Sequence, residues 1–353
     1  MPLSPPRACA ALLATLLSGT VAAAESAAAK PKAPPSVAPL AAGEKVGWSH
    51  APYEAGDCSL CHQRSDPKNP GPIVKGVNEL CTSCHEEFAE VKERKFRHPP
   101  AEAACTNCHN PHNSRERKLL VAEQTALCFG CHADVKAASE TARVKHAALS
   151  TGSRCVNCHN PHGASVEHLL VQLPFDLCLS CHSKDGVPDG RGATLTNFKS
   201  WLEQNKVWHA PVEAKDCTAC HKPHGSDSFR LLVAEYPAKF YAPYDPANYA
   251  LCFSCHNDRV VAEPVTTTLT NFRDGSKNLH YLHVNRERGR TCRACHEVHA
   301  AKQEHQIREG VPYGARGWVL KLNYTKTATG GSCAKTCHGT KTYSYKPVPE
   351  KKS

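Results

Sequence analysis

The feature that most constrains this chain is a segment of 28 residues that carries the pattern CxxCH twice. Between Cys105 and His132 it reads CTNCHNPHNSRERKLLVAEQTALCFGCH, and a further histidine, His112, follows three residues after the first pattern's own His109. CxxCH is the pattern of covalent c-type haem attachment, in which two thioethers hold the porphyrin and the histidine ligates the iron. Residues i and i+4 share one face of a helical turn, so Cys105 and His109 can reach the same flat macrocycle.

This doubled motif occurs five times, which sets the architecture before any helix or strand is considered. Cys155–His182 repeats it at identical spacing, whereas Cys58–His85 has Gln-Arg-Ser in place of Asn-Pro-His. Cys217–His256 carries a 12-residue insertion, and Cys292–His338 carries 18 extra residues and ends in the longer CAKTCH. The five units predict ten haems, attached through Cys58, Cys61, Cys81, Cys84, Cys105, Cys108, Cys128, Cys131, Cys155, Cys158, Cys178, Cys181, Cys217, Cys220, Cys252, Cys255, Cys292, Cys295, Cys333 and Cys337. The predicted proximal ligands are His62, His85, His109, His132, His159, His182, His221, His256, His296 and His338.

Zinc binding and disulfide formation are the alternative uses of such cysteine pairs. The spacing between the two pairs of a unit lies within the range of zinc ribbons, and cysteines of exported proteins often form disulfides. Neither use requires a histidine directly after the second cysteine in all ten motifs. Of 21 cysteines, 20 belong to the motifs and Cys9 lies near the N-terminus, so haem attachment accounts for every other cysteine.

The composition predicts a fold that depends on its cofactors. Mean hydropathy is −0.47 and aromatic residues make up 7% of the 353 residues, which is little apolar material for cores of this size. Ten porphyrins would supply the missing apolar mass and couple folding to haem binding. We therefore expect a mostly irregular multihaem fold with short α-helices at the motifs, little or no sheet, and cores of stacked haems. Val319–Tyr324 alternates and predicts one short strand, and the insertion Tyr236–Tyr249 reads as an ordered surface loop.

The formal net charge of +10 does not indicate a nucleic-acid partner. A ferric haem between two histidines contributes about +1 from the iron and porphyrin and about −2 from its propionates. Ten such haems add about −10, which cancels the charge of the protein. The basic excess is therefore better explained as compensation for propionates, and we expect no nucleic acid among the partners.

The N-terminus predicts export. Residues 1–24 resemble a secretory signal peptide, with Arg7 before an apolar run from Ala8 to Leu17 and small residues at the expected cleavage site. Residues 25–47 are rich in Ala and Pro and read as a linker, and no later stretch has the 18 apolar residues of a membrane span. The expected divisions after them are two-haem units at 48–92, 93–138, 139–190, 191–262 and 263–340, followed by a basic tail at 341–353.

From His50 to His338 the chain resembles the doubled-CxxCH multihaem c-type cytochromes, relatives of the class III cytochromes c. The block at Cys155–His182, CHNPHG followed by LL and LCxxCH, is specific to that family. The resemblance implies haems with two histidine ligands in close-packed chains that carry electrons in periplasmic or extracellular respiration. Two departures are the missing Pro-His in unit one and the longer loop of the last motif.

Twelve histidines remain for the distal side of the haems, and the only methionine is Met1. A histidine precedes each unit by seven to nine residues, and units two to five carry the second histidine of the first motif. His168 and His305 share a repeat position that holds Lys118, Arg230 and Gly71 in the other units, so they are not expected to be ligands. His280 forms an HxxH pair with His283, like the adjacent histidines that serve two haems in class III cytochromes. The candidates are His50, His98, His112, His146, His162, His209, His224, His280, His283 and His299, with a five-coordinate haem in unit one as the alternative to His280.

The predicted function is electron transfer rather than bond chemistry, because an iron with histidine on both faces has no open site. Ligation without methionine favours low potentials, which suit anaerobic respiration. The expected partners are redox proteins: a quinol oxidase-type donor in the inner membrane, and an outer-membrane conduit or terminal reductase as acceptor. The alternatives are a reductase of a small nitrogen compound or oxyanion, whose open iron we would expect in unit one near Arg64, and a structural role in a porin conduit or a filament.

Two segments echo each other upstream of the last two units. TLTNFK at Thr194–Lys199 and TLTNFR at Thr268–Arg273 each place a Phe 11 residues before the upstream histidine of the unit that follows, His209 or His283. In this alignment His280 corresponds to Lys206 and is an additional histidine.

Overall fold

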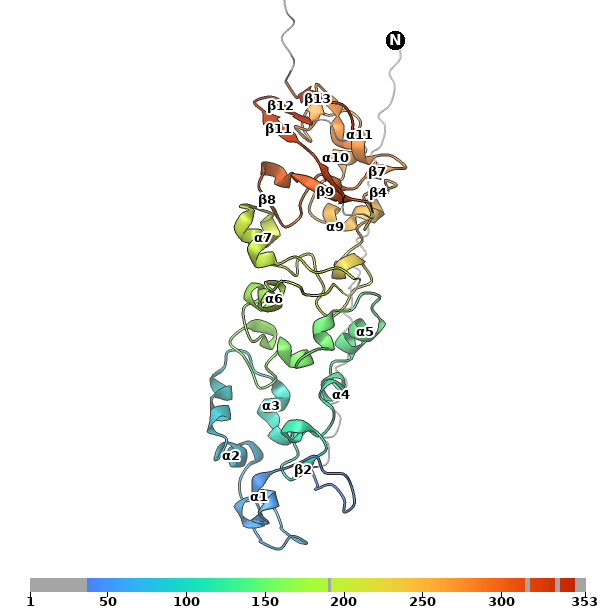
Figure 1. Ribbon diagram of the computed structural model, residues 1–353. Helices are drawn as coiled ribbons and strands as arrows, with labels where there is room; N and C mark the ends of the chain where they lie inside the picture. The colour runs from blue at the N-terminus through green and yellow to red at the C-terminus, as the bar shows by residue number, and fades with distance from the viewer. Residues whose placement is uncertain (1–36, 190–191, 315–317, 334–336, 347–353) are drawn as a thin grey trace, which may run out of the picture. The chain divides into compact units, whose positions relative to one another are not determined.

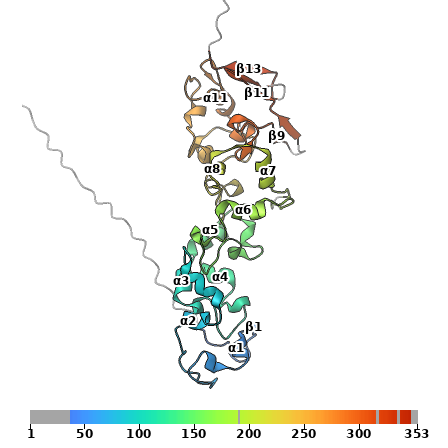
Figure 2. The same cartoon turned by 90° about the vertical axis from the view of Figure 1, so that its left-hand side faces the viewer.

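The structure is a computed structural model that describes residues 37–189, 192–314, 318–333 and 337–346. The expected signal peptide, Cys9, most of the linker, the three residues inside CAKTCH and the end of the basic tail lie outside the described residues. The chain divides into Met1–Pro34 and Pro35–Ser353, and everything that follows concerns the second unit. In Figures 1 and 2 its segments succeed one another in sequence order, from blue α1 to red β13.

Eight of the ten haem motifs lie on or beside short helices, as predicted; the first motif of unit four lies in a turn, and Cys333 of the last motif ends a strand. First motifs begin on the 3-10 helices Cys58–Leu60, Cys105–Asn107, Arg154–Asn157 and Cys292–Ala294. Second motifs of units one to four lie on or at the end of α2 (Val77–Thr82), α4 (Gln124–Phe129), α6 (Pro174–His182) and α9 (Ala250–Phe253). The remaining α-helices are α1 (Ala51–Glu54), α3 (Pro99–Ala103), α5 (Ala133–Thr141), α7 (Phe198–Gln204), α8 (Ala210–Glu213), α10 (Arg259–Ala262) and α11 (Leu279–Val284). Further 3-10 helices are Glu86–Glu93, Arg117–Leu119, Ala147–Leu149, Glu167–Leu169, Phe229–Leu231, Pro246–Tyr249 and Glu304–Gln306.

The described strands form small antiparallel sheets. Two-stranded pairs are β1 (Trp48–Ser49) with β2 (Asn113–Ser114), β3 (Val207–Trp208) with β8 (Ala300–Ala301), β4 (Tyr241–Ala242) with β7 (Gly289–Arg290), β5 (Arg273–Asp274) with β6 (Lys277–Asn278), and β9 (Gly310–Tyr313) with β10 (Trp318–Lys321). A three-stranded sheet joins β11 (Tyr324–Thr327), β12 (Gly330–Cys333) and β13 (Lys341–Ser344). The expected single strand at Val319–Tyr324 is thus divided between β10 and β11, and the expected tail begins as strand β13 because β12 supplies its hydrogen-bonding partner.

Each unit is joined to the next by a short antiparallel contact beside its upstream histidine. The contacts are β1 with β2, Phe96 with Ala164, Val144 with Ser226, and β3 with β8. At the two strand pairs the backbone amide of the upstream histidine donates to the carbonyl of the second histidine in the next unit's first motif. His50 donates to His112 at 2.9 Å, and His209 donates to His299 at 3.0 Å. Two histidines from neighbouring units are therefore held side by side by the main chain.

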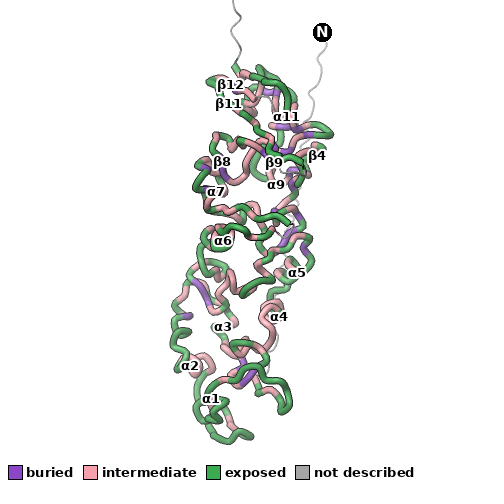
Figure 3. Tube along the Cα trace, in the orientation of Figure 1, coloured by how far each residue is buried: buried purple, intermediate pink, exposed green. Residues whose placement is uncertain are grey.

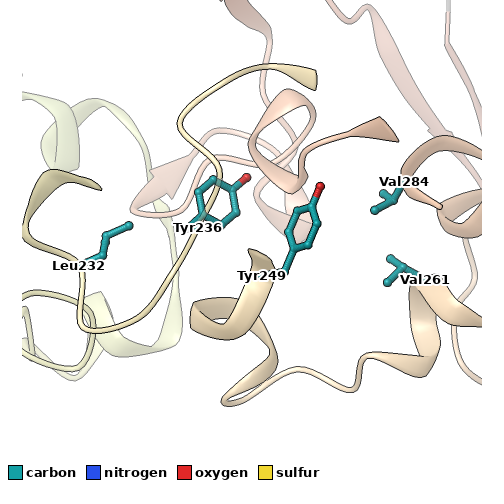
Figure 4. Close-up of a cluster of buried hydrophobic side chains, with 5 residues drawn as sticks. All are labelled: Leu232, Tyr236, Tyr249, Val261 and Val284. Carbon is teal, nitrogen blue, oxygen red and sulfur yellow. The ribbon is translucent and has the colours of Figure 1, made fainter. Parts of the chain in front are cut away.

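Buried apolar residues are few and scattered, as the sparse purple segments of Figure 3 show. The largest buried cluster lies between units four and five and consists of Leu232, Tyr236, Tyr249, Val261 and Val284 (Figure 4). Tyr249 is 0% exposed and Tyr236 is 4% exposed. The Tyr-rich insertion is ordered and has exposed residues between its ends, as expected of a surface loop. It is also anchored, because its two terminal tyrosines pack into this cluster and β4 pairs with β7.

Candidate haem sites

The structure brings the histidines together in facing pairs, and each pair joins a motif histidine to a histidine outside the motifs. The rings are nearly parallel, at 7° to 27°. The pairs, with the separations of their ring centroids, are His50–His85 (6.1 Å), His62–His112 (6.1 Å), His98–His132 (6.2 Å), His109–His162 (6.0 Å), His146–His182 (6.3 Å), His159–His224 (6.0 Å), His209–His256 (6.0 Å), His221–His299 (6.3 Å) and His280–His296 (6.3 Å).

These separations suit a metal ion between the rings. An imidazole nitrogen binds a metal at about 2 Å, with its ring centroid about 1 Å behind that nitrogen. Two imidazoles on opposite sides of one ion therefore have centroids about 6 Å apart. Direct stacking would bring the rings closer, so the gap fits an iron and the porphyrin around it.

The pairing follows one rule in units one to four. The upstream histidine of a unit faces the second motif of the same unit, as His50 faces His85. The second histidine of a first motif faces the first motif of the preceding unit, as His112 of unit two faces His62 of unit one. Neighbouring units are therefore interlocked through their candidate distal ligands.

The same rule explains why unit one has no Pro-His and unit five has an additional histidine. Residues 1–57 carry no CxxCH motif that a histidine at positions 63–65 could face. Residues 339–353 carry no Pro-His or Val-His that could face the first motif of unit five, and there His280 faces His296. The expectation that the first motif of unit one lacks a sixth ligand is wrong, because His62 faces His112. The first motif that no Pro-His or Val-His faces is that of unit five, where His280 takes this place.

The last second motif is placed less completely, because residues 334–336 lie outside the described residues. Burial lowers the pKa of His283, and the nearby Arg290 and His338 lower it further. His338 is thus close enough to influence His283 electrostatically, but the described residues show no facing ring pair between them, and the ring 5.7 Å from His283 is Phe272.

Hydrogen bonds orient the motif histidines. In every unit the Nδ1 of the first-motif histidine lies 2.8 to 3.1 Å from the carbonyl oxygen nine residues later: His62 to Gly71, His109 to Lys118, His159 to His168, His221 to Arg230 and His296 to His305. A carbonyl partner makes Nδ1 the protonated nitrogen and leaves Nε2 free to bind iron.

This accepting carbonyl belongs to the repeat position of His168 and His305. All five residues there have positive φ, from 54° to 73°, which costs a residue other than glycine roughly 1–2 kcal/mol. The strained turn directs the carbonyl at the ligand, while the side chain of His168 is 79% exposed. The position contributes its backbone rather than its side chain, which sequence reasoning did not foresee.

Replacing His168 or His305 with alanine should therefore leave every haem six-coordinate. The carbonyl that holds His159 or His296 stays in place when the imidazole is removed. Electron paramagnetic resonance (EPR) of the oxidised variants checks this, and the appearance of a high-spin signal in either one would contradict it.

The upstream histidines are oriented by the neighbouring unit. Nδ1 of His50, His98 and His146 lies 2.8 to 3.0 Å from the carbonyl oxygen of Pro111, Pro161 and Pro223, respectively. Each proline directly precedes the second histidine of the next unit's first motif. One loop therefore supplies a facing imidazole to one motif and orients the facing imidazole of another.

Burial favours the neutral imidazole, which is the form that binds a metal, at several of the candidate ligands. It lowers the pKa of His280 to about 3, helped by His296 and His283. Asn278 caps the helix that carries His280, and its side chain accepts from the His280 amide at 3.0 Å. Burial also lowers the pKa of His98, His112, His146, His162, His182, His209, His221, His224 and His296.

One candidate ligand faces a carboxylate. Nδ1 of His299 lies 3.6 Å from an oxygen of Glu297, which pairs with Arg308 at 2.8 Å. Although burial opposes ionisation, His299 and Arg308 lower the pKa of Glu297. Carboxylate partners raise the basicity of a ligating imidazole. This motif reads CHEVH, where units two and three have CHNPH and unit four has CHKPH, so its distal histidine has a distinct environment.

The motifs adjoin one another in sequence order. Within each unit burial raises the pKa of a first-motif thiol and a second-motif thiol raises it further, as Cys84 does for Cys61. Between units the thiols of Cys81–Cys105, Cys128–Cys155, Cys178–Cys217 and Cys252–Cys292 lie within hydrogen-bonding reach. The hydrogen bond with Cys81, for example, lowers the pKa of Cys105 to about 7.

Buried side-chain hydrogen-bond donors that have no partner are a further observation that fits haem binding. His182 Nδ1, Tyr249 Oη, Arg273 Nε and Arg293 Nε are buried and lack a hydrogen-bond partner among the described residues. A buried donor without a partner costs about 1–3 kcal/mol, and haem propionates are acceptors. Arg293 lies inside the motif CRACH, and Tyr249 stands three residues before Cys252, with its hydroxyl on the same side of the cluster as that of Tyr236 (Figure 4).

The two alternative uses of the cysteines gain no support. Among the described residues no three His, Cys, Asp or Glu side chains form a group that could hold a bare metal ion. The 20 motif cysteines are all free rather than joined in disulfides.

A family model described as the doubled CXXCH motif matches residues 50–90, 98–137, 146–187 and 209–260, which are units one to four. The chain is a multihaem c-type cytochrome of the doubled-CxxCH family. Its cofactors are covalently bound c-type haems.

Over 96 residues the chain is 31% identical to a protein named multiheme cytochrome MtrA from Shewanella baltica (strain OS185). The match covers 26% of this chain, and the chain spans 29% of the length of that relative. Within the described part of the chain no helix is long and apolar enough to cross a membrane.

Proposed function

We propose that this protein is a decahaem electron carrier in which every iron is held between two histidines. The observation that supports this most directly is that nine of the ten motif histidines face a second imidazole at 6.0 to 6.3 Å. When bound, such a haem supplies one-electron oxidation and reduction. The proposed distal ligands are His50, His98, His112, His146, His162, His209, His224, His280, His283 and His299.

Hydrogen bonds hold the imidazoles in place, and burial favours the neutral ring at several sites. Backbone carbonyls fix Nδ1 as the donor, and burial lowers the pKa of, for example, His146 and His280. Each motif adjoins the next from Cys58 to Cys337, which supports electron passage through the units in sequence order. The absence of a methionine from the mature sequence supports low potentials.

We also propose a cellular location and redox partners for this electron transfer. The N-terminal sequence favours export to the periplasm, and the likeness to a protein named multiheme cytochrome MtrA supports redox proteins as partners. We infer a donor of the quinol oxidase type and an acceptor that is an outer-membrane conduit or a terminal reductase, in anaerobic or extracellular respiration.

Catalysis of substrate reduction would need a motif histidine without a facing imidazole. His62 of unit one, where an open iron was expected, faces His112. Of the described motif histidines only His338 has no facing imidazole, and His283 is its proposed ligand. No other observation on the described residues favours the reductase, and none favours a porin or filament role over a soluble carrier.

The proposal predicts ten haems per mature chain, including one at Cys333–His338, because the haem motifs use all 20 mature cysteines. Intact mass spectrometry of the exported protein counts them, and nine would mean that CAKTCH carries none. A reductive titration should then take ten electrons, and the oxidised protein should show only low-spin EPR signals. A high-spin ferric signal in the unaltered protein would contradict ligation by two histidines throughout.

A further inference from the structure

An aromatic ring packs against four of the five histidines that face first motifs. In each case the ring meets the imidazole edge-on or tilted, at 59° to 73°. The contacts, with centroid separations, are Tyr53 on His112 (5.2 Å), Phe88 on His162 (4.8 Å), Phe198 on His299 (4.7 Å) and Phe272 on His280 (5.0 Å).

The four rings have a common origin in the sequence. Each lies in the segment before a unit and contacts the histidine that faces the first motif of that unit. Phe198 and Phe272 belong to the two TLTNF segments, so this contact gives the echoed sequence a role. Thr270 of the second TLTNF segment also lies 3.2 Å from Nδ1 of His280 through its hydroxyl.

Unit three departs from this pattern in sequence and in geometry. Residues 133–154, which precede it, contain no Phe, Tyr or Trp. Its first pair, His159–His224, has an interplanar angle of 27°. The four first-motif pairs with an aromatic contact have angles of 14°, 15°, 7° and 19°, so the pair without a contact is the least parallel.

Edge-to-face packing restricts the rotation of an imidazole. A ligand held through Nε2 can still turn about the axis from that nitrogen to the iron. An aromatic ring against its face or edge favours one orientation, because aromatic pairs prefer tilted or perpendicular contacts. The relative orientation of two ligand planes changes the splitting of the iron d orbitals, and therefore the EPR signal of a low-spin ferric haem.

We propose that Tyr53, Phe88, Phe198 and Phe272 are positioning residues that fix the plane of the distal imidazole at the first haem of units one, two, four and five. They act through the histidine and do not touch the iron. The first haem of unit three has no such ring. The inference rests on the proposed ligation by two histidines.

The test uses the full haem-loaded protein with Phe198→Leu, Phe272→Leu and the double variant. Leucine keeps apolar volume and removes the ring. Phe175→Leu is the matched control, because Phe175 has a contact with Lys215 and no ring contact with a histidine. Phe272→Tyr is the conservative variant that keeps the ring. Intact mass confirms ten haems in each, and spin-quantified EPR difference spectra are recorded for the oxidised proteins.

The Phe198 ring also lies 6.3 Å from His182, and the Phe272 ring lies 5.7 Å from His283. We therefore expect each leucine variant to move the low-spin signal of the first haem of unit four or five, and at most one further haem, towards a more anisotropic form. The double variant should move two to four. Phe175→Leu and Phe272→Tyr should match the unaltered protein. Unchanged spectra in both leucine variants would overturn the positioning role, as would a high-spin signal, which would show that the ring retains the ligand rather than orients it. A high-spin signal already present in the unaltered protein would instead refute the proposed ligation, so the two failures are distinct.

Discussion

Replacing His112 with alanine is expected to leave one haem high-spin, and that haem is the first of unit one rather than of unit two. His112 belongs to the motif Cys105–His109 in sequence, but its ring faces His62. The motif histidine His109 faces His162 of unit three. Loss of the His112 imidazole therefore removes the sixth ligand from an iron attached to the neighbouring unit.

A pair of double variants locates the affected haem. With Cys58 and Cys61 changed to serine, unit one has no first haem, and adding His112→Ala should create no new high-spin signal. With Cys105 and Cys108 changed to serine, the same addition should create one. The opposite result would show that His112 serves its own motif and that the units are not interlocked. Carbon monoxide binding by the reduced protein gives a second measure, because only an iron with an open face binds it.

Replacing His280 with alanine is expected to produce one high-spin haem, at Cys292–His296 in the same unit. His280 faces His296 with centroids 6.3 Å apart, and burial lowers its pKa to about 3, so it is a neutral potential ligand at any ordinary pH. His283→Ala should affect a different haem, that of the last motif, because His283 is the upstream histidine of unit five and His338 is close enough to lower its pKa. The double variant should therefore show two high-spin haems.

His305→Ala is the matched control for both, since His305 lies in the same unit and is exposed. An unchanged low-spin spectrum for His280→Ala would show that another residue completes that haem. A high-spin haem located in unit one would mean that His280 reaches across the length of the chain. The structure argues against this, since His280 contacts Phe272 and His296 within its own unit.

The tertiary structure revealed site residues that are only indirectly visible in the sequence. The carbonyl acceptors lie at a position that holds Gly, Lys, His or Arg, and only their shared positive φ identifies the role. Glu297 was visible as a departure from CHNPH to CHEVH. The aromatic residues had a stronger signal, because the TLTNF segments place Phe198 and Phe272 at matching positions.

The sequence alone determined the class of protein, the covalent attachment points and the pool of candidate distal histidines. Haem attachment is a local property, since two cysteines and a histidine on one turn define it without reference to the rest of the chain. The irregular fold followed from the shortage of apolar residues.

Which histidine faces which motif was decided only by the tertiary structure. The antiparallel contacts between units place His112 beside His50 and opposite His62, a pairing between residues 50 positions apart. Counting along the chain assigned each Pro-His to its own unit, because sequence proximity was the only distance available. Main-chain pairing between units places each of these histidines opposite a motif of the preceding unit. Unit one therefore needs no Pro-His of its own, and the first motif of unit five is faced by His280.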